Sequence, residues 1–239
     1  MQPHVAIRAR LCQHPCMAAG RSDRRVTLNY WKQPLVTVPD EVWTTPDLAG
    51  LVLAETGLTQ VPEAIGRLAS LRMLDLGHNA LAALPDAIGD LAGLSDFLYV
   101  HDNRLTRLPQ TIARLTGLQY LNVGDNPIAE LPPAIGAMGG LVELRADHCA
   151  LTALPDAIGD LAALRYLTLR GNRLTSLPPA VARLAVLRQL DLRGNPLEDW
   201  PAAIADLPAL EKLDVRWVAL PPAPPWIEAL RARGCLVYV

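Results

Sequence analysis

The chain has little of what usually marks a nucleic-acid-binding or membrane protein. Its 239 residues carry 22 basic and 24 acidic side chains, a formal net charge of −2, so no excess positive charge favours nucleic acid or anionic lipid. Arginines interrupt the apolar residues of the first 25 positions, which leaves no run of signal-peptide or membrane-spanning length there. We therefore expect neither a nucleic acid nor a membrane as a partner.

Lysine and phenylalanine are also scarce. The chain has only Lys32 and Lys212 as lysines, and Phe97 is its single phenylalanine. Abundant alanine, leucine, proline and arginine beside so little lysine are typical of a GC-rich coding sequence, which favours a bacterial source. The 51% of hydrophobic residues is nevertheless ample for a sizeable core.

What the chain does have is a repeat. The stretch 71–93, LRMLDLGHNALAALPDAIGDLAG, has the spacing L-x-x-L-x-L-x-x-N-x-L-x-x-L-P-x-x-I-x-x-L-x-x over 23 residues. The next unit begins at Leu94, and from there further units begin, at separations of 24, 23, 23, 23 and 23 residues, at Leu118, Leu141, Leu164, Leu187 and Leu210. A fixed period of this length predicts a solenoid rather than a compact globule.

Each half of the unit predicts one kind of local structure. Leu74 and Leu76 alternate with polar neighbours, which indicates a half-buried strand with the leucines inward and Asp75 outward. In the second half, apolar residues three apart indicate a short 3₁₀ or α turn, and the proline should occupy the first position of that turn. One unit cannot bury its leucines alone, so stacked units should share one core.

The asparagine position of the unit should turn the chain away from the sheet. A buried side-chain amide there can bond the backbone groups that the turn leaves unpaired. We call it the N slot, and it holds in chain order Gln33, Thr56, Asn79, Asn103, Asn126, Cys149, Asn172, Asn195 and Val218.

This pattern resembles the leucine-rich repeat family over roughly residues 26–218, and its LPxxIxxL half resembles the 23-residue Ras-suppressor-like subclass. The resemblance implies an α/β repeat solenoid, a right-handed curved array with a parallel concave sheet and short 3₁₀ or helical turns on the convex side. It also implies a protein-binding role without catalysis or cofactor. Extracellular relatives usually have cysteine-bridged caps, a pattern that Cys12, Cys16, Cys149 and Cys235 do not form, so we expect a reducing, cytoplasmic compartment.

We divide the chain into a flexible leader at 1–25, a degenerate first repeat or cap at 26–47, regular repeats at 48–218 and a helix–strand cap at 219–239. Two other interpretations of the leader stay open: a secretion leader, or residues that precede an alternative start at Met17. The cysteines and histidines of this leader give only a weak metal-binding pattern.

Aromatic residues add two expectations. All five tryptophans lie near the two ends of the repeat array, where large rings can cover the exposed end of the core. A ligand site at one end of the array is the alternative. The tryptophans are Trp31, Trp43, Trp200, Trp217 and Trp226. The unit that begins at Leu94 has one additional residue beside Phe97, which predicts a bulge or bend that either aims the ring at the concave face or has no role.

Function in such an array should depend on the outward strand positions, because the inward ones form the core. Neighbouring strands lie about 4.8 Å apart, so equivalent positions form ladders across the sheet. We expect a partner surface with an apolar and aromatic group at Met73, Phe97, Tyr99 and Tyr120. The whole candidate surface comprises Met73, Asp75, Phe97, Tyr99, His101, Tyr120, Asn122, Glu143, Arg145, Tyr166, Arg170, Arg193 and Arg216.

Histidines and aspartates gather where the strands should end, at His78, His101, Asp102, Asp125, Asp147 and His148. Such groups can bind zinc or transfer protons, and a metal site at this edge is one hypothesis. No glycine-rich phosphate loop or nucleophile elbow accompanies them. We therefore predict a solvated or partner-contacting edge, with no metal ligand and no catalytic residue.

Arginines repeat in the last units. Arg170, Arg193 and Arg216 occupy one slot, and Arg165 and Arg188 occupy another. Pairing with Asp191 and Asp214 is one explanation of this file; the other is a surplus of guanidinium groups for an acidic segment of the partner. Our main hypothesis is thus a non-enzymatic protein-interaction module, and the alternative is a secreted effector or signalling component whose repeats recruit a substrate.

Overall fold

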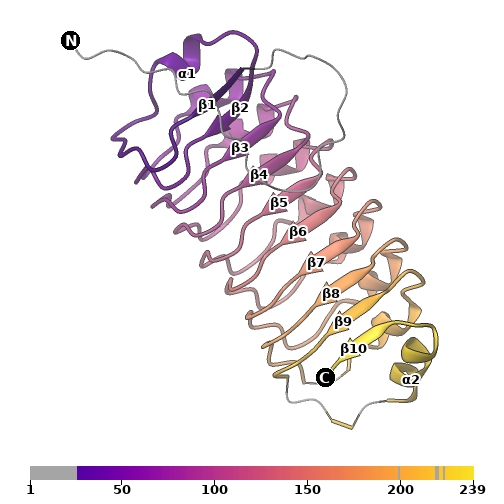
Figure 1. Ribbon diagram of the computed structural model, residues 1–239. Coiled ribbons are helices and arrows are strands. Elements are labelled where there is room, and N and C mark those ends of the chain that lie inside the picture. Colours follow the sequence, from indigo (N-terminus) through magenta and orange to yellow (C-terminus); the bar gives the residue numbers. More distant parts are fainter. Residues whose placement is uncertain (1–25, 199, 219–220, 223) are drawn as a thin grey trace.

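Ten parallel strands form one sheet in chain order in a computed structural model of the protein (Figure 1). The structure describes residues 26–198, 200–218, 221–222 and 224–239. Each strand pairs with the next in the chain, so the sheet grows by one strand per repeat. The strands are β1 (Val26–Asn29), β2 (Leu48–Val52), β3 (Met73–Asp75), β4 (Phe97–Tyr99), β5 (Tyr120–Asn122), β6 (Glu143–Arg145), β7 (Tyr166–Thr168), β8 (Gln189–Asp191), β9 (Lys212–Asp214) and β10 (Leu236–Tyr238).

Short 3₁₀ turns lie on the other side of the solenoid. The predicted fold class, a leucine-rich-repeat-like solenoid with a parallel sheet and 3₁₀ turns, is therefore confirmed (Figure 1). The turns are η1 (Glu63–Arg67), η2 (Asp86–Asp90), η3 (Gln110–Arg114), η4 (Pro133–Ala137), η5 (Asp156–Asp160), η6 (Pro179–Arg183) and η7 (Ala202–Asp206). The proline of each LPxxI motif is not the first residue of the turn but the extended residue before it, as Pro85 is before η2.

The core lies between the sheet and the turns. The inward strand leucines and the turn isoleucine of a unit, for example Leu74, Leu76 and Ile88, have no exposed surface. These side chains join one continuous apolar cluster from Val38 to Cys235. Because neighbouring units supply each other's buried surface, burial stabilises the stack rather than any single repeat.

The N slot bonds the backbone as expected. Nδ2 of Asn126 donates to the carbonyls of Val100 and Val123 at 2.9 and 3.0 Å, and Oδ1 accepts the N–H of Leu105 at 2.9 Å. Equivalent bonds occur at Asn79, Asn103, Asn172 and Asn195. Each asparagine therefore links its own repeat to the preceding one.

Cys149 takes the N slot of one repeat without an amide. Its Sγ lies 3.5 Å from the carbonyl oxygen of Val123, a weak contact. The N–H of Ile128, which an asparagine oxygen would accept, bonds instead to the carbonyl of Asn126 at 2.8 Å. Burial raises the pKa of the thiol to about 11, so Cys149 is an unreactive core residue.

The two ends of the solenoid differ from the repeats. At the N-terminal end, β1 pairs with β2, and α1 (Glu41–Thr44) replaces the first 3₁₀ turn. At the C-terminal end, α2 (Pro225–Ala232) leads to β10, which pairs with β9. The domain boundaries drawn from the sequence stay predictions, and the leader at 1–25 with its histidines, its cysteines and Met17 lies outside the described residues.

The tryptophans do not all cover the core. Trp43, Trp200 and Trp226 are partly buried against the apolar cluster, and Trp200 and Trp226 meet edge to face at 5.9 Å. Trp31 and Trp217 are 54% and 70% exposed, so the expectation of a capping role is wrong for these two. Trp31 instead donates from Nε1 to Glu55.

The additional residue before β4 produces a bend rather than a bulge. The chain bends at Asp96, and the strand then pairs with β3 in unbroken register, Met73 beside Phe97 and Leu74 beside Leu98. Arg72 bonds both Ser95 and Asp96, which fixes the bend. Among the described residues, no helix has the length and apolar character needed to cross a bilayer.

Candidate functional site

The candidate surface lies on the outward face of the sheet, which we call the concave face. Pairing of the strands places Met73, Phe97, Tyr120, Glu143 and Tyr166 in one row. A second row, two residues later, contains Asp75, Tyr99, Asn122 and Arg145. His101, Arg170, Arg193 and Arg216 follow the ends of their strands. All thirteen candidate residues are half-buried except Arg145, which is exposed, so their side chains remain partly accessible.

Four of these residues form an aromatic patch, Met73, Phe97, Tyr99 and Tyr120. The rings of Phe97 and Tyr99 stack with centroids 4.4 Å apart, and Tyr99 meets Tyr120 edge to face at 5.1 Å. Met73 lies beside Phe97 in the adjacent strand. The guanidinium carbon of Arg145 lies 5.5 Å from the Tyr120 centroid. The contacts hold the rings in place on the face that the core does not use.

The histidine pair, His78 and His101, borders the patch. Nδ1 of His78 lies 2.5 Å from Oδ2 of Asp102, and Nε2 of His101 lies 3.2 Å from Nε2 of His78. Burial and the neighbouring His78 lower the pKa of His101 below its ordinary value of 6.5. Burial raises the pKa of Asp75, and the charges of the two histidines offset part of this rise.

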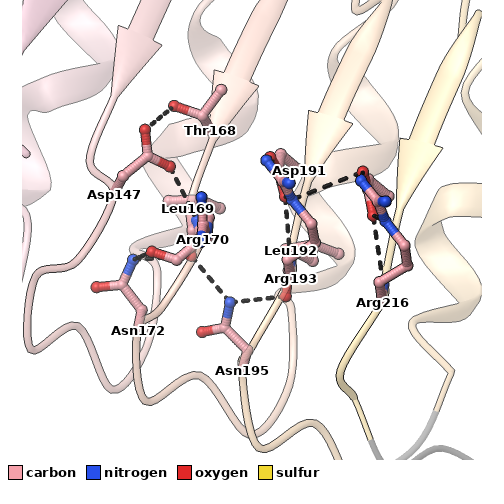
Figure 2. A network of polar contacts seen from close by, with 11 residues as sticks. Asp147, Thr168, Leu169, Arg170, Asn172, Asp191, Leu192, Arg193, Asn195 and Arg216 are labelled. Atoms are coloured by element: carbon pink, nitrogen blue, oxygen red, sulfur yellow. Dashed lines mark hydrogen bonds and ion pairs between the residues drawn. The ribbon is translucent and has the colours of Figure 1, made fainter. Parts of the chain in front are cut away.

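The six polar residues predicted at the strand ends divide into separate groups. Asp147 accepts bonds from the Thr168 hydroxyl and the Arg170 N–H at 2.8 and 3.0 Å (Figure 2), and it belongs to a unit two repeats beyond that of His101. Burial raises the pKa of Asp147. In the part of the chain that the structure describes, no three His, Cys, Asp or Glu residues are placed to hold a metal ion together.

Toward the C-terminal end, two arginines bind two carboxylates (Figure 2). Nε of Arg193 lies 2.9 Å from both carboxylate oxygens of Asp191 and 3.6 Å from Oδ2 of Asp214. Nη2 of Arg216 bonds the same Asp214 oxygen at 2.7 Å. Asp214 is only 1% exposed; although burial opposes ionisation, the Arg216 hydrogen bonds and the Arg193 charge hold the pKa of Asp214 below 3.8.

These contacts support internal pairing for three of the five arginines, whereas Arg165 and Arg170 form no ion pair with a described residue. Arg193 and Arg216 are paired with carboxylates, and Arg188 pairs with Glu211 at 3.1 Å. Arg165 and Arg188 directly precede β7 and β8, whereas Arg170 and Arg193 follow the other ends of these strands, so the five arginines are not one surface. Asp191 and Asp214 are the two carboxylates that the sequence offered as partners, and Glu211 is a third.

A hollow of about 390 Å³ lies among these groups on the concave face. Its walls contain the paired Arg193 and Asp191, together with Arg170 and Lys212. Arg170 and Lys212 form no ion pair with any described residue; their charged groups lie near the rings of Trp217 and Tyr238, at 5.5 and 5.6 Å. The walls also contain the carboxylates of Asp125 and Asp147.

Trp217 adjoins this site, although the sequence favoured a capping role for it and left a ligand site at one end as the alternative. Its backbone is left-handed, with φ of 62°, a conformation that bulky residues rarely adopt. Arg170, Arg193 and Arg216 place their guanidinium carbons 5.5, 5.9 and 5.7 Å from its ring. The sequence indicates the left-handed backbone at this position, because the residue directly before the N slot is Gly171 and Gly194 in the two preceding units.

Known proteins share this repeat sequence and this fold. A sequence model of the family described as leucine rich repeat matches residues 139–197 and 162–217. The leucine-rich repeat domain of the type III effector XopL is 30% identical, with a TM-score of 0.72, and the alignment covers 86% of this chain and 73% of that domain. The chain belongs to the leucine-rich repeat family.

Two further leucine-rich repeat structures are similar. LIC12759 of Leptospira interrogans is 27% identical with a TM-score of 0.68, over 90% of this chain and 66% of that one. The ectodomain of the plant receptor kinase GASSHO1/SCHENGEN3 from Arabidopsis thaliana, in complex with CASPARIAN STRIP INTEGRITY FACTOR 2, is 28% identical with a TM-score of 0.77. That alignment covers 89% of this chain but 26% of the ectodomain, so this chain spans about a quarter of the ectodomain's length. No curated protein matches the chain.

Proposed function

We propose that this leucine-rich repeat protein is a non-enzymatic interaction module that binds a protein partner on its concave face. The aromatic patch is the observation that carries the proposal. Phe97, Tyr99 and Tyr120 hold one another in fixed contact on a face that the core does not use. Preordered aromatic rings lose little side-chain entropy on binding and commonly supply most of an interface's energy.

The hollow suggests the second half of the interface. Arg170 and Lys212 lie there without carboxylate partners among the described residues, whereas Arg193 is neutralised by Asp191 and Asp214. A carboxylate of the partner would meet these two cations there. We therefore propose a partner with an apolar segment against the aromatic patch and an acidic segment at the hollow.

Other properties of the chain are part of the same proposal. The strands β4 to β9 begin at intervals of 23 residues, which supports the Ras-suppressor-like subclass. The free, buried thiols of Cys149 and Cys235 fit a reducing, cytoplasmic compartment, and the scarcity of lysine fits a bacterial source.

The test is affinity capture of partners from the native host with the full chain as bait. The double variant Phe97→Ala/Tyr99→Ala should lower the yield of a specific partner about tenfold or more, because interface rings each contribute about 2 kcal/mol or more when they are hot spots. Val186→Ala, which removes an exposed side chain outside the strands, is the matched control and should capture normally. Retention of the partner by a folded double variant would refute the proposal.

Similarity to the XopL repeat domain favours one alternative, a secreted effector whose repeats recruit a substrate. Both roles use the same concave face, but they differ in the source of the partner. Parallel capture from bacterial lysate and from a eukaryotic cell lysate distinguishes them. Loss of a eukaryotic protein with the double variant would favour the effector, whereas loss of a bacterial protein would favour the cytoplasmic module.

A further inference from the structure

The histidine pair connects an exposed carboxylate to the aromatic patch. His78 bonds Asp102 through Nδ1 and His101 through Nε2, at 2.5 and 3.2 Å. The ring of His101 in turn stands edge-on to Tyr99, with centroids 5.9 Å apart. Gly77 leaves room for this arrangement, because a Cβ at that position would lie 2.6 Å from Cε1 of His101. A rotation of the His101 ring would therefore change the surroundings of the Tyr99 ring, which belongs to the patch.

The hydrogen bonds determine where the protons lie while both rings are neutral. The Asp102 carboxylate can only accept, so His78 carries its proton on Nδ1 and offers Nε2 as an acceptor. His101 then donates from Nε2, which leaves its Nδ1 unprotonated. Nδ1 of His101 is buried and has no hydrogen-bond partner among the described residues. The neutral pair thus contains one unsatisfied acceptor and no unsatisfied donor.

Acid disturbs this arrangement whichever ring takes the next proton. If His101 takes it, the proton goes to the buried Nδ1. If His78 takes it on Nε2, His101 must offer its own Nε2 as acceptor and carry its proton on Nδ1. Both routes create a buried N–H without an acceptor, which costs the full desolvation of that group. A second added proton would leave two N–H groups facing each other across the 3.2 Å contact.

We propose that protonation of the histidine pair turns the His101 ring from Tyr99 toward Asp125, and so weakens partner binding at the aromatic patch in mildly acidic solution. This inference rests on the proposed function, because it assigns regulation to the same patch. The charged groups that face His101 are Asp75 of the preceding repeat, Asp102 beside it and Asp125 of the next repeat. Asp125 is exposed, and its carboxylate has no ion pair among the described residues, so it can accept the displaced ring.

The direction of the pH effect follows from burial. Burial and His78 lower the pKa of His101 from 6.5, so the His101 ring is neutral at pH 7 and takes up its proton below pH 6.5. The switch would then respond to mild acidification and not to changes above neutrality.

Histidine ring-nitrogen and tyrosine ring NMR on the full chain, without partner, tests the switch. The Tyr99 ring resonances should change with the same midpoint as His101. In His78→Ala that shared midpoint should rise toward 6.5, because a neighbouring positive charge is removed. In Asp102→Asn it should fall, because a negative charge is lost. His148→Asn, in the same slot as His78 but three repeats away, should leave both signals as in the parent.

Tyr99 resonances that stay constant while His101 titrates, or variant midpoints that move the other way, would overturn the switch. The second arm uses a partner captured at pH 7.5 and then washed at pH 5.5. The parent should release it faster at the lower pH, and His101→Phe, which keeps a ring beside Tyr99, should not. Equal acceleration in both would also overturn the inference. Failure of the proposed function is recognised separately, by normal capture with Phe97→Ala/Tyr99→Ala.

Discussion

At the scale of single residues, the N slot shows how one side chain joins two repeats. Asn126 supplies two donors and one acceptor to backbone groups of its own and the preceding unit, all at 3.1 Å or less. Those groups are buried between the sheet and the turns, where water cannot replace the amide. Cys149 offers only long sulfur contacts, and the backbone of its neighbourhood forms a compensating bond.

We therefore expect unequal costs for similar truncations in this slot. Asn126→Ala should lower the free energy of unfolding by about 3 kcal/mol, because it leaves several buried backbone groups unpaired. Cys149→Ala should cost about 1 kcal/mol or less, because few hydrogen bonds are lost. Urea titrations of the two variants give the comparison. Equal costs would show that the amide bonds contribute no more than the volume of the side chain.

At the scale of elements, the ends of β8 and β9 carry paired charges, and Asp214 of β9 is the one charged side chain that is buried among the described residues. Asp191 and Asp214 each accept the N–H of the residue two positions on, Arg193 and Arg216, and also bind its guanidinium. These bonds turn the chain where the strands end. The two carboxylates that the sequence offered as partners of the arginines are thus also structural parts of the turns.

Removing the charge of Asp214 should destabilise the protein by about 2 kcal/mol at pH 7, since it leaves Arg193 and Arg216 without a shared buried partner. The arginines hold the pKa of Asp214 below 3.8, so its contribution is present above that value and is lost as the pH falls further. Urea unfolding at pH 7, 5 and 3 should therefore show Asp214→Asn converging on the parent in acid.

The control for this prediction is Asp90→Asn, which breaks an exposed ion pair with Arg114 on the turns. Its cost should be about 1 kcal/mol or less. An Asp214→Asn variant that differs from the parent by the same amount at all three pH values would contradict the assignment.

Most of the elements could be predicted from the sequence, and the reasons are specific. The alternation around Leu74 and Leu76 and the LPxxI spacing determine strand and turn, because burial of those side chains leaves one register. The patch of Phe97, Tyr99 and Tyr120 follows from that register. The pairing of Arg193 and Arg216 with Asp191 and Asp214 was one of two explanations that the sequence left open, because long side chains choose among several neighbours in adjacent repeats.

At the scale of the whole molecule, the concave face carries its two candidate contact sites at different ends. The aromatic patch spans β3 to β5, and the hollow is lined by residues of β8 and β9 and by Arg170 beyond β7. With neighbouring strands about 4.8 Å apart, β4 and β8 are separated by about 19 Å. An extended segment of about six residues would cover that distance. The partner therefore needs its apolar and acidic groups at about this spacing.

This arrangement predicts that salt acts on one end of the interface only. Arg170→Gln/Lys212→Gln removes the two unpaired cations without breaking an ion pair, whereas a change at Arg193 would also disturb Asp191 and Asp214. The parent's association rate with a captured partner should fall as salt rises through about 0.1 M, where the screening length is about 10 Å. The double variant should associate about three- to tenfold more slowly at low salt and respond weakly to salt, because steering by the two cations is lost.

The matched control is Arg114→Gln/Arg183→Gln, which removes the same amount of charge from the exposed turns η3 and η6. It should keep the parent's salt response if position matters more than net charge. Dissociation from the aromatic patch should change less than association in all these proteins, because Phe97 and Tyr99 remain in contact with the partner. Identical salt dependence of the parent and Arg170→Gln/Lys212→Gln would mean that the hollow does not meet an acidic segment. The partner would then be held by the aromatic patch alone.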